Sequence, residues 1–403
     1  MICIRSYTAL ILAVLVFCGP ARSAPAENGI LQVERTVLMA GLAEPWDLAF
    51  APDGAMLFTE KCRGLSVRTA DGTVRLLFGS AGAALEAADF FCQGQSGMLG
   101  VALDPAFAEN RQVYVYMASN AGKRKTNRVV RLAVNQAYTG AGARKDIVAD
   151  IPFKQSFNWW GRAGAHSGGR IRFSPFDGYL YVTTGDNHHG PLPQDLSRLG
   201  GKVLRIDRDG RAAAGNNSPP GGDPRIYTYG HRNVQGIAFR PGTGRPFACE
   251  HGPGHDDEVT PLAPGGNGGW DPAPTQRVSC ASDYCGYTSN KPDNTPTPMT
   301  DLNRFPDALR PSWTNRGVSE GMGPCVFLNG PHWKDWEGRL AVGFLRGARI
   351  ELLQMDADGM TTAAAIVAGL PAQRMRSLVL GPAGAMYVAT DAGEIWRLAR
   401  GGP

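Results

Sequence analysis

The sequence carries little charge for its length and lacks several patterns that mark other protein classes. Only 19% of its 403 residues are Asp, Glu, Lys or Arg, and Lys123-Arg124-Lys125 is its one basic cluster. The net charge of +5 is therefore too dispersed for a nucleic-acid surface. No cysteine spacing fits a zinc site. The N-terminal apolar run, Ala9 to Phe17, is too short to anchor the chain in a membrane.

That apolar run belongs to an expected export signal at residues 1–26. Arg5 precedes the run, and small residues follow it at 21–23 and 24–26, so all three parts of a secretory signal are present. We therefore expect a periplasmic or secreted protein without stable membrane insertion. Residues 27–403 are expected to form its single mature domain.

Removal of the signal leaves six cysteines. Six cysteines in an exported chain allow up to three disulfides among 15 pairings. Only Cys280 with Cys285 is suggested by proximity. The others are Cys62, Cys92, Cys249 and Cys325.

Turn-forming residues are abundant, with 52 Gly and 29 Pro, which favours a strand-rich protein. One pattern recurs six times: an apolar strand, a Pro-Asp-Gly-like turn and a second strand rich in Tyr, Val and Phe. Six such hairpins predict an all-β, six-bladed β-propeller with loops gathered at the ends of a central channel. A pair of β-sandwiches is the alternative, which the similarity of the copies disfavours. The copies span Asp47 to Glu60, Gly100 to Met117, Arg170 to Asp186, Gly236 to Glu250, Cys325 to Phe344, and Arg376 to Asp391.

Two long insertions separate the repeats, at 136–165 and 272–323. Neither shows a helical period that would indicate a further domain. We expect both to cover one mouth of the channel.

The stretch from Tyr227 to Glu258 concentrates polar residues at both ends of one predicted strand pair. A hairpin there brings Arg232, Asn233 and Gln235 beside the segment Glu250 to Glu258. Donors then face carbonyls and carboxylates, an arrangement that suits an anionic ligand held with a cation such as calcium. A polar surface loop is the alternative interpretation.

Polar residues also stand at the equivalent place before other repeat copies, namely Gln95, His166, Arg374 and Arg376. A histidine at a loop-to-strand junction can serve as a general base, although a structural hydrogen bond is the commoner fate of a histidine. Together with Arg232, Arg374 and Arg376 predict a ligand with several negative charges.

The segment Gly252-Pro253 offers backbone carbonyls to a cation, and Asp256, Asp257 and Glu258 add carboxylates of the kind calcium prefers. An acidic surface loop is again the alternative.

The segments GQSGMLGVALDPAF, HSGGRIRFSP, LGGKVLRIDRDG, YGHRNVQGIAF and EHGPGHDDEV occur in this order. In their sequences and in their order, these segments resemble the soluble, periplasmic glucose/sorbosone dehydrogenase family. The resemblance runs from Leu42 to Leu398. It implies a six-bladed propeller that uses pyrroloquinoline quinone (PQQ) and calcium to oxidise sugars.

The resemblance also implies roles for the polar residues. His166 matches the general base, and Gln95 matches a residue that contacts substrate and cofactor. Arg232 and Asn233 match the pair that binds the quinone oxygens, and Arg232 would stabilise the negative charge that develops there. Further positions match cofactor or metal sites: Arg374 and Arg376 for cofactor carboxylates, the carbonyls of Gly252 and Pro253 for the catalytic calcium, and Asp257 and Glu258 for a structural calcium.

Three positions depart from the family pattern. Ala165 stands where the glucose dehydrogenases have Asp, so glucose specificity is not implied. Leu345 replaces a cofactor-binding Lys, whose contact is either missing or supplied by neighbouring Arg346. Trp313 is the one nearby candidate for an aromatic cofactor partner.

We therefore expect a PQQ-dependent dehydrogenase that oxidises an aldose or a related sugar aldehyde to its lactone or acid. Because the chain has no Cys-x-x-Cys-His haem motif, its electrons must leave to a separate quinone or redox protein. A non-catalytic propeller that binds a carbohydrate or protein partner is the first alternative. A calcium-dependent, lactonase-like hydrolase is the second, and the arginines fit it poorly.

Overall fold

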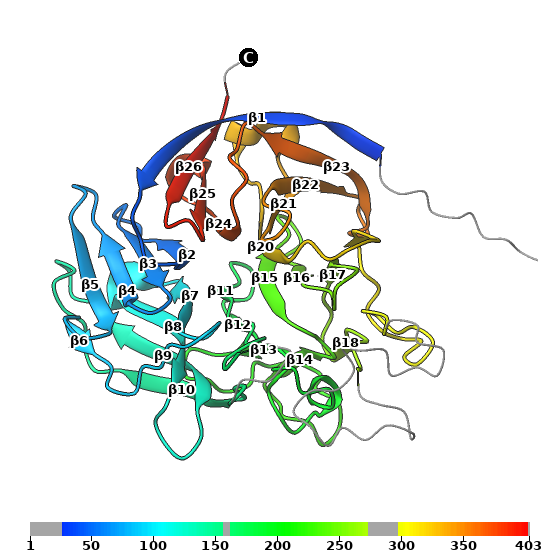
Figure 1. The fold of residues 1–403 in the computed structure, drawn as a ribbon, viewed down its shortest axis with the longest axis horizontal. Helices are drawn as coiled ribbons and strands as arrows, with labels where there is room; N and C mark the ends of the chain where they lie inside the picture. Colours follow the sequence, from blue (N-terminus) through cyan, green and yellow to red (C-terminus); the bar gives the residue numbers. More distant parts are fainter. Residues whose placement is uncertain (1–25, 156–161, 273–296, 402–403) are drawn as a thin grey trace, which may run out of the picture.

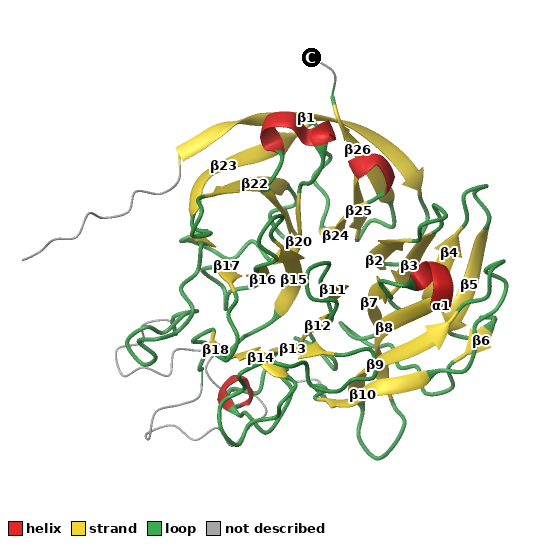
Figure 2. Ribbon diagram, turned by 180° about the vertical axis from the view of Figure 1, so that it is seen from behind, coloured by secondary structure: helices red, strands yellow, loops and turns green. Residues whose placement is uncertain are grey.

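The computed structural model describes residues 26–155, 162–272 and 297–401, and almost all of their regular secondary structure is β-strand (Figures 1 and 2). Within these ranges no helix is long and apolar enough to cross a membrane. The expected signal at 1–26 lies almost wholly outside them, as do Cys280 and Cys285. The helical pieces are α1 (Phe107–Asn110), η1 (Leu192–Gln194), η2 (Pro331–Trp336) and η3 (Pro382–Gly384).

Four sheets contain four or five strands each. The first sheet comprises β2 (Pro45–Phe50), β3 (Met56–Glu60), β4 (Gly64–Arg68), β5 (Val74–Gly79) and β6 (Leu85–Glu86). The second comprises β7 (Met98–Leu103), β8 (Gln112–Ser119), β9 (Thr126–Ala133) and β10 (Lys145–Ile151). The third comprises β11 (Ile171–Phe173), β12 (Leu180–Thr183), β13 (Val203–Ile206), β14 (Ile226–Tyr229) and β18 (Gly266–Asn267). The fourth comprises β15 (Val234–Phe239), β16 (Pro246–Glu250), β17 (Glu258–Pro261) and β19 (Trp313–Thr314).

A fifth sheet has eight strands because the N-terminal strand joins two groups. β1 (Ala26–Met39) pairs in parallel with β23 and antiparallel with β26. One group comprises β20 (Met322–Phe327), β21 (Leu340–Phe344), β22 (Ile350–Met355) and β23 (Thr361–Ala368). The other comprises β24 (Met375–Leu380), β25 (Met386–Thr390) and β26 (Ile395–Arg400).

The innermost strands of these groups surround one axis. β2 contacts β7, and contacts continue through β11, β15, β20 and β24 back to β2. Figure 1 shows these six strands around the centre of the molecule. The predicted all-β propeller is thus confirmed. The predicted six separate blades are confirmed only in part, because hydrogen bonding through β1 yields five sheets.

Each repeat copy forms an antiparallel pair of strands at the centre. In the first copy Gly54 has a φ of +84°, which a glycine adopts without strain, and the Asp53 carboxylate accepts the Ala55 N–H at 3.1 Å. The turn residues therefore fold the chain back where the pattern predicts. Apolar residues of neighbouring sheets fill the space between them, as Leu57 and Leu65 do against Val115 and Val130.

The one disulfide among the described residues joins Cys62 to Cys92. The sequence spacing did not indicate this pair. Cys249 and Cys325 are buried free thiols. The insertion at 136–165 contains strand β10, and the insertion at 272–323 contains β19, so each lends a strand to a sheet.

Candidate active site

A cavity of about 310 Å³ lies at one mouth of the channel. The first strand of each repeat hairpin begins at this mouth and the second strand ends there, because the pair is antiparallel. The cavity is therefore lined from both positions. Residues at the starts of inner strands are Trp46, Gln95, His166, Asn233, Arg374 and Arg376, and residues after second strands are Lys61, His251, Leu345 and Asp391.

His166 is held by a buried carboxylate. Its Nδ1 lies 2.7 Å from Oδ1 of Asp186, which follows β12 and is fully buried. Trp270 donates its indole N–H to the other carboxylate oxygen at 3.0 Å. Gln95 Oε1 lies 3.3 Å from the backbone N–H of His166. The ring orientation of His166 is thus fixed by its neighbours.

Burial lowers the pKa of His166 well below its ordinary value of 6.5, and the positive charge of Arg232 acts in the same direction. The ring is therefore neutral at neutral pH. Because Asp186 accepts at Nδ1, the lone pair of the neutral ring resides on Nε2. A buried neutral imidazole with a carboxylate behind it can accept a proton at Nε2.

Arg232 and Asn233 are positioned by Glu250. Both donate their backbone N–H groups to Glu250 Oε1, Asn233 at 2.9 Å. Arg232 also donates from its guanidinium to the carbonyl of His251, a cavity residue, at 3.0 Å. The hairpin predicted between Tyr227 and Glu258 is therefore confirmed, since β15 pairs with β16 and brings these groups together.

Arg374 and Arg376 converge on one carboxylate. Arg374 Nε lies 2.7 Å from Asp391 Oδ2, and Arg376 makes two contacts of 2.7 Å with the same side chain. Two positive charges thus meet one negative charge at the cavity wall. Lys61, paired with Glu44 at 2.5 Å, adds a further cation to the lining.

The predicted calcium ligands do not share one environment. Asp257 accepts hydrogen bonds from Gly252 N–H at 2.9 Å, Ser319 Oγ at 2.5 Å and Glu320 N–H at 2.7 Å, so protein donors occupy its oxygens. Burial raises the pKa of the Glu258 carboxyl well above its ordinary value, and the nearby carboxylate of Glu250 adds to the shift. Glu258 is therefore the member of this set that a cation would stabilise.

The loop that follows His251 is tightly curled. A Cβ on Gly252 would lie 1.7 Å from the carbonyl oxygen of His255, so only glycine fits there. Asp256 has a φ of +53°. Within the described ranges no three His, Cys, Asp or Glu side chains gather as a metal site. Backbone carbonyl oxygens are therefore the metal ligands that this loop offers.

The three residues singled out against the family pattern lie in different surroundings. Leu345 lines the cavity, whereas Arg346, the residue that could have supplied the lysine's contact, is exposed and is not among the cavity residues. Trp313 packs against Phe344, with ring centroids 6.1 Å apart, whereas the aromatic residue that lines the cavity is Trp46. Ala165 is fully buried and offers no polar side chain beside His166.

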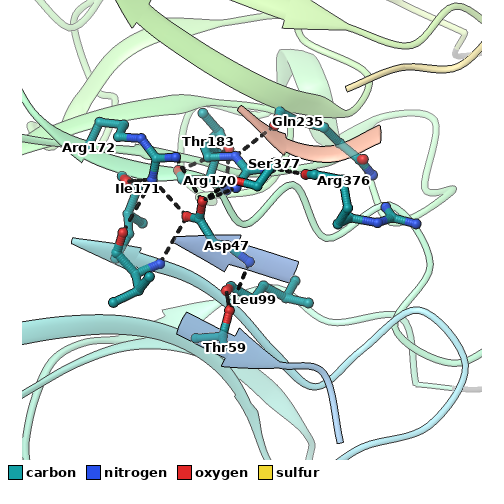
Figure 3. Close-up of polar contacts among 11 residues, drawn as sticks. Asp47, Thr59, Leu99, Arg170, Ile171, Arg172, Thr183, Gln235, Arg376 and Ser377 are labelled. Atoms are coloured by element: carbon teal, nitrogen blue, oxygen red, sulfur yellow. Dashed lines mark hydrogen bonds and ion pairs between the residues drawn. The ribbon is translucent and has the colours of Figure 1, made fainter. Parts of the chain in front are cut away.

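A buried charge cluster next to Trp46 ties the inner strands together (Figure 3). Asp47 pairs with Arg170 at 2.5 Å and with Arg172 at 2.7 and 2.8 Å. Burial alone would raise the pKa of Asp47, but the two guanidinium groups hold it below 3.8. The cluster also reaches three more strands. The Val101 N–H and the Ser377 hydroxyl donate to Asp47, and Arg170 donates to the carbonyls of Gln235 and Arg376.

Known proteins resemble this chain along most of its length. The glucose/sorbosone dehydrogenase family model matches residues 42–397. Aldose sugar dehydrogenase YliI of Escherichia coli is 28% identical over 374 residues, which cover 90% of this chain and 91% of that protein. Quinoprotein glucose dehydrogenase B of Acinetobacter calcoaceticus is 29% identical over 283 residues, 64% of this chain and 56% of that protein.

Solved structures show the same relationship. The PQQ-bound form of aldose sugar dehydrogenase from Streptomyces coelicolor superposes with a TM-score of 0.68 at 26% identity, covering 93% of this chain and 99% of that chain. Because the family model spans most of the sequence, the chain belongs to the glucose/sorbosone dehydrogenase family of oxidoreductases.

Proposed function

We propose that this protein is an exported PQQ- and calcium-dependent dehydrogenase that oxidises an aldose or a related sugar aldehyde to its lactone or acid. The observation that carries the proposal is the buried His166–Asp186 pair in a cavity whose wall also holds Gln95, Asn233 and Arg376. A base beside a cluster of cations suits removal of a hydroxyl proton while a hydride leaves the adjacent carbon.

The residues at the cavity fit PQQ. Arg374, Arg376 and Lys61 supply cationic hydrogen-bond donors, which its carboxylates would share with Asp391 and Glu44, and Trp46 supplies an aromatic face. Lys61 would take the part that Leu345 leaves open. PQQ, when bound, supplies the two-electron acceptor, and calcium supplies a Lewis acid.

The chain's own residues account for the proton. His166 accepts it from the sugar hydroxyl at Nε2, and Asp186 stabilises the imidazolium that results. Arg232, held by Glu250, places positive charge beside the site. For the catalytic calcium we propose the carbonyls of Gly252 and Pro253, and for a structural calcium we propose Glu258. The hydrogen-bond donors around Asp257 argue against metal binding by that residue.

Other features support the finer details of the proposal. The Cys62–Cys92 disulfide suits an oxidising compartment such as the periplasm. We interpret the eight-stranded sheet as two blades joined by β1, which makes six in all. A separate quinone or redox protein would receive the electrons.

The decisive experiment is titration of the purified apo-protein with PQQ, with and without calcium, followed by dye reduction against a panel of aldoses. Tight, calcium-dependent binding with dye reduction is expected. Binding without turnover on any sugar would instead support the alternative of a non-catalytic propeller, and absence of binding would overturn the quinoprotein assignment.

A further inference from the structure

A second histidine contacts the proposed base. His188 Nε2 lies 2.8 Å from His166 Nε2, and the two ring centroids are 3.8 Å apart. His166 lines the cavity, whereas His188 is only 4% exposed. The contact thus involves the nitrogen of His166 that would accept the sugar proton.

The surrounding contacts assign the shared hydrogen. Asp186 receives donors from the His166 ring, from the backbone N–H of His188 at 2.9 Å, and from the indole of Trp270. An ionised carboxylate only accepts, so the hydrogen of His166 resides on Nδ1 and its Nε2 carries a lone pair. In the 2.8 Å contact the donor is therefore His188, as its Nε2–H tautomer.

The backbone holds this pair in place. His166, Asn187 and His188 have φ values of +51°, +50° and +57°, a left-handed region that residues other than glycine seldom adopt. Asn187 donates its side-chain amide to the His166 carbonyl at 2.8 Å. Strained conformations gathered in this way persist only where surrounding contacts impose them, and they cluster at functional sites.

We propose that His188 caps the base in the sugar-free protein and that the reacting hydroxyl of the sugar must replace it. An imidazole lone pair accepts one strong hydrogen bond, so His188 and the sugar compete for His166 Nε2. His188 is thus a positioning residue that occupies the lone pair of the base until the sugar arrives and thereby weakens sugar binding, while Asp186 fixes the tautomer. This inference rests on the proposed function.

The first test needs no activity. In protein labelled with ¹⁵N-histidine, the side-chain nitrogen spectrum should show Nε2 of His166 without a proton and Nε2 of His188 with one. His166→Gln and His188→Gln assign the two signals. A proton on His166 Nε2, or a His188 ring protonated only at Nδ1, would overturn the cap.

The second test separates KM from kcat in the PQQ- and calcium-loaded enzyme. His188→Phe retains a planar aromatic ring but cannot donate a hydrogen bond, so KM for the sugar should fall by roughly 3- to 10-fold, the ordinary worth of one hydrogen bond, with kcat little changed. His188→Gln retains an N–H donor and should keep the KM of the parent. His189→Phe is the neighbouring control and should do the same.

A rise in KM, or a loss of kcat without a fall in KM, in His188→Phe would refute the cap. If no sugar reduces the dye even with the parent enzyme, the proposed function fails, while the nitrogen spectrum still decides the hydrogen bond. If His188→Phe does not fold, the spectrum of the parent protein remains the deciding measurement.

Discussion

At the scale of single residues, the two ring nitrogens of His166 have different tasks. Nδ1 is hydrogen-bonded to Asp186, and Nε2 is the nitrogen that would accept the proton of the substrate. The 2.7 Å contact at Nδ1 removes any choice of tautomer, and burial keeps the ring neutral. These two effects make the side chain ready to accept a proton at Nε2. The role of Arg232 is different, because this residue contributes positive charge and not a proton acceptor.

Replacing His166 or Asp186 should therefore affect turnover more than cofactor binding. In dye-reduction assays we expect His166→Ala and Asp186→Asn each to reduce kcat by roughly 100-fold or more, while the PQQ affinity measured by calorimetry stays nearly unchanged. The double variant should lose no more than the worse single variant, because the pair acts as a unit. Arg232→Ala should lower both quantities. Equal losses of affinity and kcat in His166→Ala would contradict the assigned role.

The pH dependence follows from the lowered pKa of His166. The base is neutral above its folded pKa and is lost as pH falls through that pKa, so kcat/KM should be flat from pH 6.5 to 8 and decline only below 6.5. Arg232→Gln removes a nearby positive charge and should move the acid limb to higher pH. An acid limb centred above 6.5 in the parent enzyme would disagree with a buried, neutral base.

Sequence patterns predicted one half of the cavity wall. Gln95, His166 and Arg374 precede inner strands, and Arg376 lies at the start of β24, where the repeat indicated a site. Asp186, Lys61 and Asp391 follow second strands of the same hairpins. An antiparallel pair places both positions at one mouth, so the repeat also carried a signal for these residues. His188 is different, because its contact with His166 depends on left-handed backbone angles that no pattern indicates.

At the scale of elements, the cluster around Asp47 holds the starts of the inner strands together. Arg170 and Arg172 satisfy its charge, and Arg170 continues to two carbonyls on other strands. The cavity residues Gln95 and Asn233 lie just before β7 and β15, and Arg376 lies on β24, three strands that this cluster connects. Its geometry therefore sets the spacing of the site.

Asp47→Asn should leave Arg170 with a buried, uncompensated charge. We expect the free energy of unfolding, measured by urea titration, to fall by roughly 3–5 kcal/mol. Because the pKa of Asp47 is lowered in the folded state, its contribution in the parent protein should be present above about pH 4 and lost as pH falls further. Asp71→Asn, at an exposed turn, is the control. A loss below 1 kcal/mol would show that the cluster bears little of the stability.

The loop at 252–257 and strand β17 provide a test of calcium. Saturating calcium should raise Tm by about 5 °C over protein treated with a chelator, since a bound ion stabilises only the folded state. Glu258→Gln should abolish most of that difference, whereas exposed Glu86→Gln should preserve it. Calcium stabilisation that is unchanged in Glu258→Gln would place the ion elsewhere.

At the scale of the whole molecule, the repeat predicted the blades but not their closure. Six hairpins were visible in the sequence because each is local. β1 was not, because its partners β23 and β26 lie at the far end of the chain and no local pattern links them. The Cys62–Cys92 bond escaped prediction for a different reason, since the spacing of six cysteines alone leaves 15 pairings.

Closure through β1 should be a major source of stability. Leu31 is 2% exposed and packs in the core between the last two groups of strands, whereas its neighbour Ile30 is 62% exposed. Leu31→Ala should lower the free energy of unfolding by about 3 kcal/mol in urea titrations, and Ile30→Ala by less than about 0.5 kcal/mol. Similar losses in the two variants would mean that β1 does not contribute to the core as described.

The pairing of β1 with β26 also means that the fold can close only at the end of translation. Val33 pairs with Arg400, so roughly 370 residues must be translated after the first partner before the second exists. At about 5–20 residues per second this interval is on the order of tens of seconds. During it the first strand lacks both of its partners, because β23 also lies near the C-terminal end of the chain.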